Sequence, residues 1–324
     1  MRAIVQDTYG TAAVLQTREI GLPEIGASQV LLRVRAAGVN PADWAVMSGL
    51  PYVARPIYGL RRPKHAVRGT DVAGIVEAVG AAVTRFRVGD EVFGWSEGSF
   101  AEFAAADENA LAPKPANLRF EAAATVPMAG MVALQALRDH GMVQARQTVL
   151  INGASGGIGT FAVQIARALG AEVTAVCRTA NVELMRSIGA DHVIDYTTED
   201  FTRSGRQYDV ILDNVANHSL SDLRQALAPA GTLVPNGGNF GNHWFAGGGR
   251  VVSAHLLSPF VSQALRPFLL SPNLDDLLTL KGYLEAGQVV PVVGRTYPLA
   301  EAAVAMDLVG TGHARGKVAI TVAA

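Results

Sequence analysis

A chain of 324 residues is too long for one small hydrophobic core, so two domains are expected. Its 27 basic and 28 acidic side chains give a net charge of -1, which excludes a chain-wide attraction to nucleic acid or anionic membranes. The single cysteine, Cys177, excludes an intramolecular disulfide framework and a Cys-rich zinc site. No stretch approaches the ~20 apolar residues of a membrane span, so a cytoplasmic enzyme or binding protein is expected.

The first 120 residues are expected to form a compact, barrel-like β domain. Residues 28–39 and 71–80 carry many β-branched side chains, and glycines recur between the strand-like stretches. Residues 111–118, with the sequence LAPKPANL, contain two prolines, so we expect a surface connection there rather than a regular element.

Strands alternate with helices after Thr125. The first strand ends in VLING, and the apolar residues of 157–169 then recur at helical spacing up to Gly170, which can cap a helix. Further strands are expected at residues 172–177, 192–196, 208–215, 231–237 and 250–255, with helices at 181–189 and 220–227. Because apolar strands alternating with helices form a parallel sheet covered on both faces, six such strands predict a doubly wound dinucleotide-binding fold.

The last part of the chain has a different pattern from the strand–helix alternation before it. Two helices are expected at residues 259–270 and 273–286, followed by a short strand near residue 292. A helix at residues 299–309 and a strand at 316–322 follow. We expect this segment to return to the first domain.

The glycine-rich turn at residues 149–159, VLINGASGGIG, allows three interpretations. In a dinucleotide-binding turn, Gly156 would let a pyrophosphate approach and Gly159 would let the helix pack against the strand. Ala154 occupies the first glycine position, with Gly153 beside it. The surrounding strand, helix and second strand favour this interpretation over a glycine turn that serves packing alone.

The other two interpretations explain fewer residues. A Gly-x-Ser-x-Gly hydrolase elbow would use Ser155 with Asp195 or Asp213 and with His218, His243 or His255, but it leaves Gly159 unexplained. A short-chain dehydrogenase would need a Tyr-x-x-x-Lys pair, and no tyrosine here has a lysine four residues later. The dinucleotide-binding turn is therefore preferred.

The end of the second central strand indicates which nucleotide binds. A carboxylate about 20 residues after the turn would bind the ribose diol of NAD, whereas an arginine accommodates the 2'-phosphate of NADP. This chain has Cys177 and then Arg178, with no acid before Glu183. A guanidinium binds phosphate through paired charged hydrogen bonds, so NADPH is favoured over a merely solvated Arg178.

Eight segments in order resemble the medium-chain dehydrogenases/reductases, in the zinc-independent quinone oxidoreductase (zeta-crystallin-like) branch. They are AAGVNPADW (36–44), GTDVAGIVEAVG (69–80), VGDEVFG (88–94), GSFAEF (98–103), ATVPMAGMVALQAL (124–137), GGIGTFAVQIAR (156–167), GADHVIDY (189–196) and GHARGKVAITV (312–322). The resemblance implies a GroES-like catalytic domain in residues 1–124 and again in 258–324. A Rossmann NADP-binding domain in 125–257 would lie between them, with the active site in the cleft.

The resemblance also bears on metal binding. Zinc-dependent members of the superfamily bind catalytic zinc through a cysteine and a histidine near the first two segments, where this chain has Asn40 and Thr70. A catalytic zinc site needs about three Cys, His or carboxylate ligands, which those segments do not offer. The expected chemistry is therefore metal-free hydride transfer to a quinone or to the β-carbon of an enone.

Site residues follow from the branch's pattern. Asn40 is expected at the nicotinamide, although Asn40-Pro41 with Asp43 also suits a helix start. Trp44 and Tyr52 are the other catalytic candidates, since Ala45 stands where some members have a tyrosine; Tyr52 packing in a loop, with water as proton donor, is the alternative. The branch's nicotinamide-contacting threonine is Val132 here. The cofactor-binding set is Asn40, Ser155, Gly156, Gly157, Ile158, Arg178, Asn181, Tyr196, Asn214, Val215, Asn236, Gly237, Leu256, Arg315 and Lys317, the last two being otherwise solvated strand ends.

Residues 55–69, RPIYGLRRPKHAVRG, contain five cations and no acid. They form either a solvated loop or a rim that attracts anionic substrates such as acyl-CoA esters. The whole sequence thus predicts an NADPH-dependent, zinc-free reductase of small quinone or carbonyl substrates, without nucleic acid or membrane partners; the resemblance allows a homodimer. A nucleotide-binding protein without turnover and, less favoured, a serine hydrolase are the alternatives.

Overall fold

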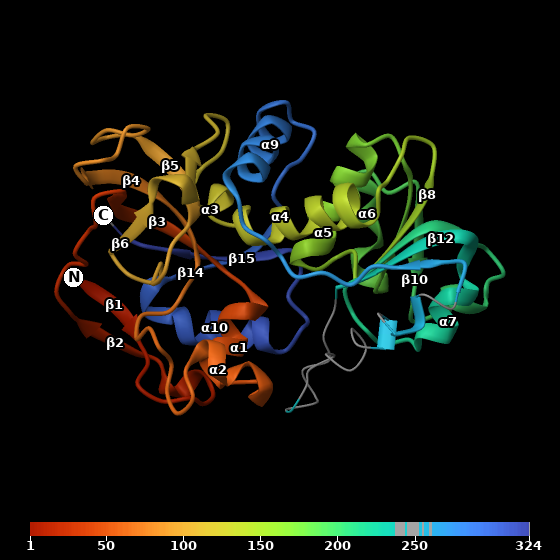
Figure 1. Ribbon diagram of the computed structural model, residues 1–324, viewed down its shortest axis with the longest axis horizontal. Helices are drawn as coiled ribbons and strands as arrows, with labels where there is room; N and C mark the ends of the chain where they lie inside the picture. The colour runs from red at the N-terminus through yellow and green to blue at the C-terminus, as the bar shows by residue number, and fades with distance from the viewer. Residues whose placement is uncertain (237–243, 245–252, 255, 259–260, 324) are drawn as a thin grey trace. The chain divides into compact units, whose positions relative to one another are not determined.

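The computed structural model describes residues 1–236, 244, 253–254, 256–258 and 261–323. Its contacts divide the chain into two units. The first unit comprises Met1–Met131, Pro272–Gly287 and Pro291–Ala324, and the second comprises Val132–Ser271 and Gln288–Val290. The last part of the chain thus returns to the unit that holds its beginning, as Figure 1 shows by the blue β15 alongside the red-orange β3.

The first unit is built on a seven-stranded sheet with the order β14-β15-β3-β4-β5-β7, in which β6 pairs with β3. Alternate side chains of β3 (Val30, Leu32, Val34) are buried in its core, as a half-buried strand requires. The strands are β1 (Arg2–Val5), β2 (Gln16–Glu19), β3 (Gln29–Val39), β4 (Asp71–Val79), β5 (Glu91–Trp95), β6 (Phe103–Asp107), β7 (Leu111–Pro113), β14 (Val293–Pro298) and β15 (Lys317–Thr321). The helices are α1 (Pro41–Ser48), α2 (Arg55–Tyr58), α3 (Phe120–Ala123), α4 (Pro127–Gln135, which continues into the second unit), α9 (Leu274–Glu285) and α10 (Ala302–Gly310).

The second unit is a six-stranded, wholly parallel sheet with the order β10-β9-β8-β11-β12-β13. Its strands are β8 (Thr148–Asn152), β9 (Glu172–Cys177), β10 (His192–Asp195), β11 (Tyr208–Asp213), β12 (Leu227–Pro235) and β13 (Ala264–Leu265). Its helices are the π-helix Ala136–His140, α5 (Gly157–Ala168), α6 (Val182–Ser187) and α7 (Leu220–Gln225). In Figure 1, α5 and α6 are drawn to the left of β8 and β12, and α7 is drawn below β12. This is the predicted doubly wound arrangement, in which the strand order reverses between β8 and β11.

Three sequence-based expectations were wrong in detail. Within the sixth strand expected at residues 250–255, the described residues Ser253 and Ala254 are helical. The sixth strand lies instead within 259–270, the segment expected to be a helix: Ala264–Leu265 pairs with Thr232 and Leu233 of β12. Pro267 disfavours helical backbone just before it, and pairing with a neighbouring strand outweighs local propensity.

The third difference concerns residues 111–118. The first residues of this segment form β7, in which Leu111 and Ala112 are buried against β5. β7 is the last strand in the sheet order, and an edge strand tolerates Pro113 because that position lacks only one ladder hydrogen bond.

Candidate functional site

The glycine-rich turn joins β8 to α5 in the second unit, as predicted. Gly153 has a φ of +76°, a left-handed conformation that favours glycine. A Cβ atom at Gly159 would collide with the carbonyl oxygen of Gly153 and lie 2.6 Å from the Cα atom of Ala154. Gly159 therefore lets the first turn of α5 pack directly against the end of β8.

The same turn has the properties of an anion cradle. The first amides of a helix have no partner within it, and the residue before α5, Gly156, has no side chain to cap them. A Cβ atom at Gly156 would meet only the carbonyl oxygen of Gly153, at 3.4 Å. Among the described residues, the space at Gly156 is therefore open at the start of α5, and a helix N-terminus of this kind fits a dinucleotide pyrophosphate.

The structure brings Ser155 and Asn181 together beside this turn. Asn181 Nδ2 donates a hydrogen bond to Ser155 Oγ at 3.0 Å. Among the described residues no histidine hydrogen-bonds Ser155, so the arrangement that a hydrolase elbow requires is not seen there.

Two predicted adenosine-side residues follow the ends of neighbouring strands. Arg178 comes directly after β9 and is exposed, and its guanidinium forms no hydrogen bond or ion pair with any residue that the structure describes. Tyr196 follows β10 and is half exposed. Burial raises the pKa of the thiol of Cys177, the last residue of β9, to about 11, so this cysteine is a buried packing residue at neutral pH.

A polar network occupies the ends of β8, β11 and β12. Asn236 Nδ2 donates to Asn214 Oδ1 at 2.8 Å, and Asn152 Nδ2 donates to the buried carboxylate of Asp213 at 2.8 Å. The backbone N–H of Val215 donates to the same carboxylate at 3.2 Å. Asn152 and Asp213 end β8 and β11, the two strands between which the strand order reverses, and open parallel sheets bind ligands at this position.

Two further residues of this unit, Leu256 and Gly237, were predicted to bind the cofactor. Leu256 is exposed, with 68% of its surface accessible. Gly237 lies outside the described residues.

A second polar cluster is buried in the first unit. Lys317 Nζ, at the start of β15, donates to Asn40 Oδ1 and to the carbonyl oxygen of Val39. Asn40 Nδ2 donates to Asp71 Oδ2 at 3.0 Å, and Lys317 Nζ lies 3.9 Å from that same oxygen. The amide of Asn40 therefore has its oxygen directed at a cation and its nitrogen at a carboxylate, which fixes its orientation.

Asp43 links this cluster to the start of α1. Its carboxylate accepts hydrogen bonds from the backbone N–H of Asn40 at 2.8 Å and from the hydroxyl of Thr70 at 2.9 Å. The helix-start interpretation of Asn40-Pro41 is therefore correct, while the Asn40 side chain remains directed at Asp71 and Lys317. Asn40 thus begins α1 and also joins the buried cluster through its side chain.

Burial dominates the electrostatics of the cluster. It raises the pKa of Asp71 to about 7, even though the nearby Lys317 cation and the Asn40 amide lower it. Burial also raises the pKa of Asp43 and lowers that of Lys317. Lys317 is only 3% exposed, so its interpretation as a solvated strand end is wrong, whereas Arg315 is exposed.

The other two catalytic candidates, Trp44 and Tyr52, also lie in the first unit. Trp44 is half-buried and packs beside Gly310, where any side chain would meet its indole. Tyr52 is 37% exposed, and the guanidinium of Arg55 lies 4.7 Å from its ring and 4.7 Å from that of Tyr9.

Sequence reasoning missed Asp71 in the cluster of the first unit, and it missed Asn152 and the role of Asp213 in the network of the second unit. Each stands at the start or end of a sheet strand, and each was visible only as a polar residue beside an apolar run. The signal in the sequence would have been an acid directly beside an apolar, strand-like run. Such an acid becomes buried at the strand end, and buried carboxylates require partners.

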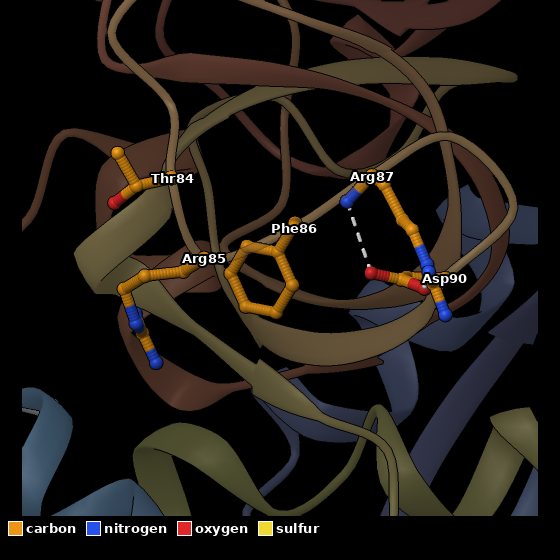
Figure 2. Close-up of a pocket in the computed structure, with 5 residues that line it drawn as sticks. All are labelled: Thr84, Arg85, Phe86, Arg87 and Asp90. Carbon is orange, nitrogen blue, oxygen red and sulfur yellow. Dashed lines mark hydrogen bonds and ion pairs between the residues drawn. The ribbon is translucent and has the colours of Figure 1, made fainter.

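A surface hollow of about 330 Å³ lies between β4 and β5 (Figure 2) and is lined by Thr84, Arg85, Phe86, Arg87 and Asp90. Its arginines already have partners in the protein. The backbone N–H of Arg87 donates to Asp90 at 3.0 Å, and the Arg85 guanidinium donates to two backbone carbonyls. It contains none of the predicted site residues.

Two features are absent from the part of the chain that the structure describes. No three or more His, Cys, Asp and Glu side chains there are placed to hold a metal ion. Among the same residues, no helix has both the length and the apolar character needed to cross a membrane.

Comparison with known proteins gives consistent similarities. Residues 26–116 match the family described as "Alcohol dehydrogenase GroES-like domain", and residues 188–320 match "Zinc-binding dehydrogenase". The chain is 36% identical to the mitochondrial NAD(P)H oxidoreductase RTN4IP1 of Bos taurus, covering 99% of this chain and 89% of the relative. It is 33% identical to the chloroplastic NADPH-dependent alkenal/one oxidoreductase of Arabidopsis thaliana, covering 99% and 79%. The quinone oxidoreductase from Coxiella burnetii superimposes with a TM-score of 0.87 at 27% identity, covering 100% and 99%.

Proposed function

The chain belongs to the medium-chain dehydrogenase/reductase superfamily, in its quinone oxidoreductase-like branch, and we propose that it transfers hydride from NADPH to a quinone or an α,β-unsaturated carbonyl compound. The observation that carries the proposal is the uncapped, glycine-lined turn between β8 and α5 at the head of a doubly wound sheet. When bound, the nicotinamide supplies the hydride, and the protein's residues bind and orient the cofactor and the substrate.

We assign the phosphate end of the cofactor to Ser155, Gly156, Gly157 and Ile158. The adenosine side is assigned to Arg178, Asn181 and Tyr196, and the ribose and nicotinamide side to Asn214, Val215, Asn236, Gly237 and Leu256. The hydrogen bonds of Asn181 with Ser155 and of Asn236 with Asn214 support grouping these residues.

In the first unit we assign Asn40, held by Lys317 and Asp71, to the reactive end of the cofactor. Arg315, which is close to Lys317 in the sequence, is assigned to the same end. An amide nitrogen has two hydrogens, and the one that Asn40 does not donate to Asp71 has no partner among the described residues. Trp44 and Tyr52 are the proposed substrate-side residues. The cytoplasmic location and the homodimer remain predictions.

We expect NADPH to gain fluorescence when mixed with the protein and to be consumed in the presence of at least one member of a quinone and enone panel. Fluorescence enhancement with neither NADPH nor NADH would contradict the oxidoreductase proposal. Enhancement without consumption of any acceptor would instead support a nucleotide-binding protein without turnover.

Arg178 tests the choice of nucleotide. Its exposed guanidinium has no described partner, so a 2'-phosphate can bind it without displacing a protein group. We expect Arg178→Asp to lower the preference for NADPH over NADH, measured as the ratio of dissociation constants, by roughly 10- to 100-fold, because a charged hydrogen bond of ~1.5–3 kcal/mol is replaced by repulsion.

A matched control removes the same charge elsewhere in the second unit. Arg146 is exposed and precedes β8, so it lies at the opposite edge of the sheet from the turn. Arg146→Asp should leave the preference unchanged. An unaltered preference in Arg178→Asp would refute the proposed role of Arg178.

A further inference from the structure

A cavity of about 400 Å³ in the first unit is lined by α1, by residues 57–70 and by the loop after β5. We call it the Arg68 cavity. The side chains that matter here are Asp43, Lys64, Arg68, Thr70, Ser96 and Glu97, all of which line it. Asp43 and Thr70 are hydrogen-bonded to each other, and Asp43 also binds the backbone of Asn40. The cavity therefore borders the buried cluster of Asn40, Asp71 and Lys317.

Arg68 is an unpaired cation in this cavity. It is only 4% exposed, and its guanidinium forms no hydrogen bond or ion pair with any described residue, with Nε fully buried. Ser96 is 6% exposed, and its Oγ atom is also buried without a partner. Burying a charge without partners is costly, so proteins rarely retain such a group unless it binds something.

The acids of the cavity do not supply the missing partner. The Asp43 carboxylate already accepts from the Asn40 backbone and the Thr70 hydroxyl, and Glu97 pairs with His65 at 3.0 Å on the exposed side. Burial lowers the pKa of Arg68, while the charges of Asp43 and Glu97 oppose that effect from a distance. The guanidinium lacks a direct anionic contact.

The other cations of residues 55–69 are unlike Arg68. Arg61, Arg62 and Lys64 are exposed, and Arg55 stacks between two tyrosine rings and donates to the carbonyl of Gly49 at 3.0 Å. The surface hollow of Figure 2 offers a second contrast, because its Arg85 donates to backbone carbonyls. Arg68 alone among these arginines is buried without a protein partner in the described chain.

We propose that the Arg68 cavity binds the carboxylate group of an anionic substrate, through the Arg68 guanidinium and the Ser96 hydroxyl. This rests on the proposed reductase function and specifies its substrate as an enone or quinone that carries a carboxylate. A guanidinium matches a carboxylate with two parallel hydrogen bonds, and Ser96 adds a neutral donor. Lys64 and the exposed arginines of the same loop increase the local concentration of anions.

The first test measures binding without turnover. Benzoate and its neutral isostere benzamide are titrated into the full-length protein by calorimetry. We expect the wild type to bind benzoate at least 10-fold more tightly than benzamide, and Arg68→Met to lose that difference. Arg68→Lys should recover part of it, since it keeps the charge without the planar pair of donors. Arg119→Met is the control, because Arg119 is exposed in the first unit outside residues 55–69, and it should bind benzoate like the wild type.

The second test uses turnover. The ratio of kcat/KM for 4-(4-carboxyphenyl)but-3-en-2-one to that for 4-phenylbut-3-en-2-one should fall roughly 10- to 100-fold in Arg68→Met, with the neutral substrate little affected. If NADPH is consumed with neither compound, the reductase proposal fails for this class while the benzoate titration still decides the cavity. Equal benzoate binding by the wild type and Arg68→Met would overturn the cavity proposal.

Stability separates a binding role from a structural one. If Arg68 is retained to bind a ligand, Arg68→Met removes an uncompensated buried charge and should raise Tm by roughly 2–4 °C in the absence of ligand. A lower Tm together with unchanged benzoate binding would show that the arginine is structural. Ser96→Ala provides a milder variant and should weaken benzoate binding without lowering Tm.

Discussion

Lys317→Met is expected to lower the free energy of unfolding of the first unit by about 3–5 kcal/mol at pH 8.5. The substitution leaves the carboxyl of Asp71, which is 0% exposed, without its cation, and it removes the donor to Asn40 Oδ1. Urea denaturation followed by tryptophan fluorescence measures the effect, because Trp44 and Trp95 both lie in this unit.

The deficit should shrink as the pH falls to 6. The pKa of Asp71 is raised in the folded protein from its usual 3.8 to about 7, so its stabilising contribution is complete below pH ~4 and is lost as the pH rises through 7. Without Lys317 that pKa rises further, and the loss continues to higher pH. The lowered pKa of Lys317 also makes this stability difference smaller at low pH. The contribution of Lys317 to the stability of the wild type is present at high pH and is lost as the pH falls.

A double-mutant cycle isolates the pair. Adding Asp71→Asn to Lys317→Met should restore much of the lost stability, because no ionisable carboxyl is then left beside the missing cation. Lys281→Met is the control, since Lys281 pairs with Glu285 on the surface of α9 and should change stability by less than about 0.5 kcal/mol. A coupling energy below about 0.5 kcal/mol would show that Lys317 and Asp71 are independent.

Gly159→Ala and Gly156→Ala should separate stability from nucleotide binding at the turn. The added methyl of Gly159→Ala collides with the carbonyl of Gly153, so we expect a loss of about 1–3 kcal/mol in stability together with weaker NADPH binding. Thermal denaturation by circular dichroism and NADPH fluorescence titration measure the two effects.

Gly156→Ala should have the opposite profile. The φ of Gly156 is -80°, which alanine adopts readily, and the nearest protein atom to the new methyl is 3.4 Å away. Stability should therefore stay within about 0.5 kcal/mol of the wild type. NADPH affinity should fall at least 10-fold, because the methyl enters the space assigned to the pyrophosphate. Unchanged affinity would contradict that assignment.

The second unit was largely predictable because its signals are local. The strand, turn and helix at residues 149–169 follow from apolar spacing and glycine positions, and the order of strands and helices restricts the sheet to a few topologies. The prediction failed at the sixth strand. There the pairing of Ala264–Leu265 with β12, rather than the β-branched residues near 251, decided which segment joined the sheet.

The buried cluster of the first unit was accessible only in part. Asn40 was predicted as a site residue and as a helix start; the structure confirms the helix start and shows the side chain hydrogen-bonded to Asp71. That its amide lies between Asp71 and Lys317 could not be read from the chain, because Lys317 is 277 residues away from it. Such contacts depend on the antiparallel pairing of β15 with β3, which packing of the whole sheet sets.

The sequence by itself determined the superfamily, the parallel nucleotide-binding sheet and the residues of its turn, because these depend on patterns within about 30 residues. Only the tertiary structure decided which charges are buried. Five cations are equivalent in the printed sequence of residues 55–69, yet folding buries Arg68 against a cavity and leaves Arg61, Arg62 and Lys64 exposed. The physical reason is that the energy of a charge depends on its access to water and to partners, and both are set by distant parts of the chain.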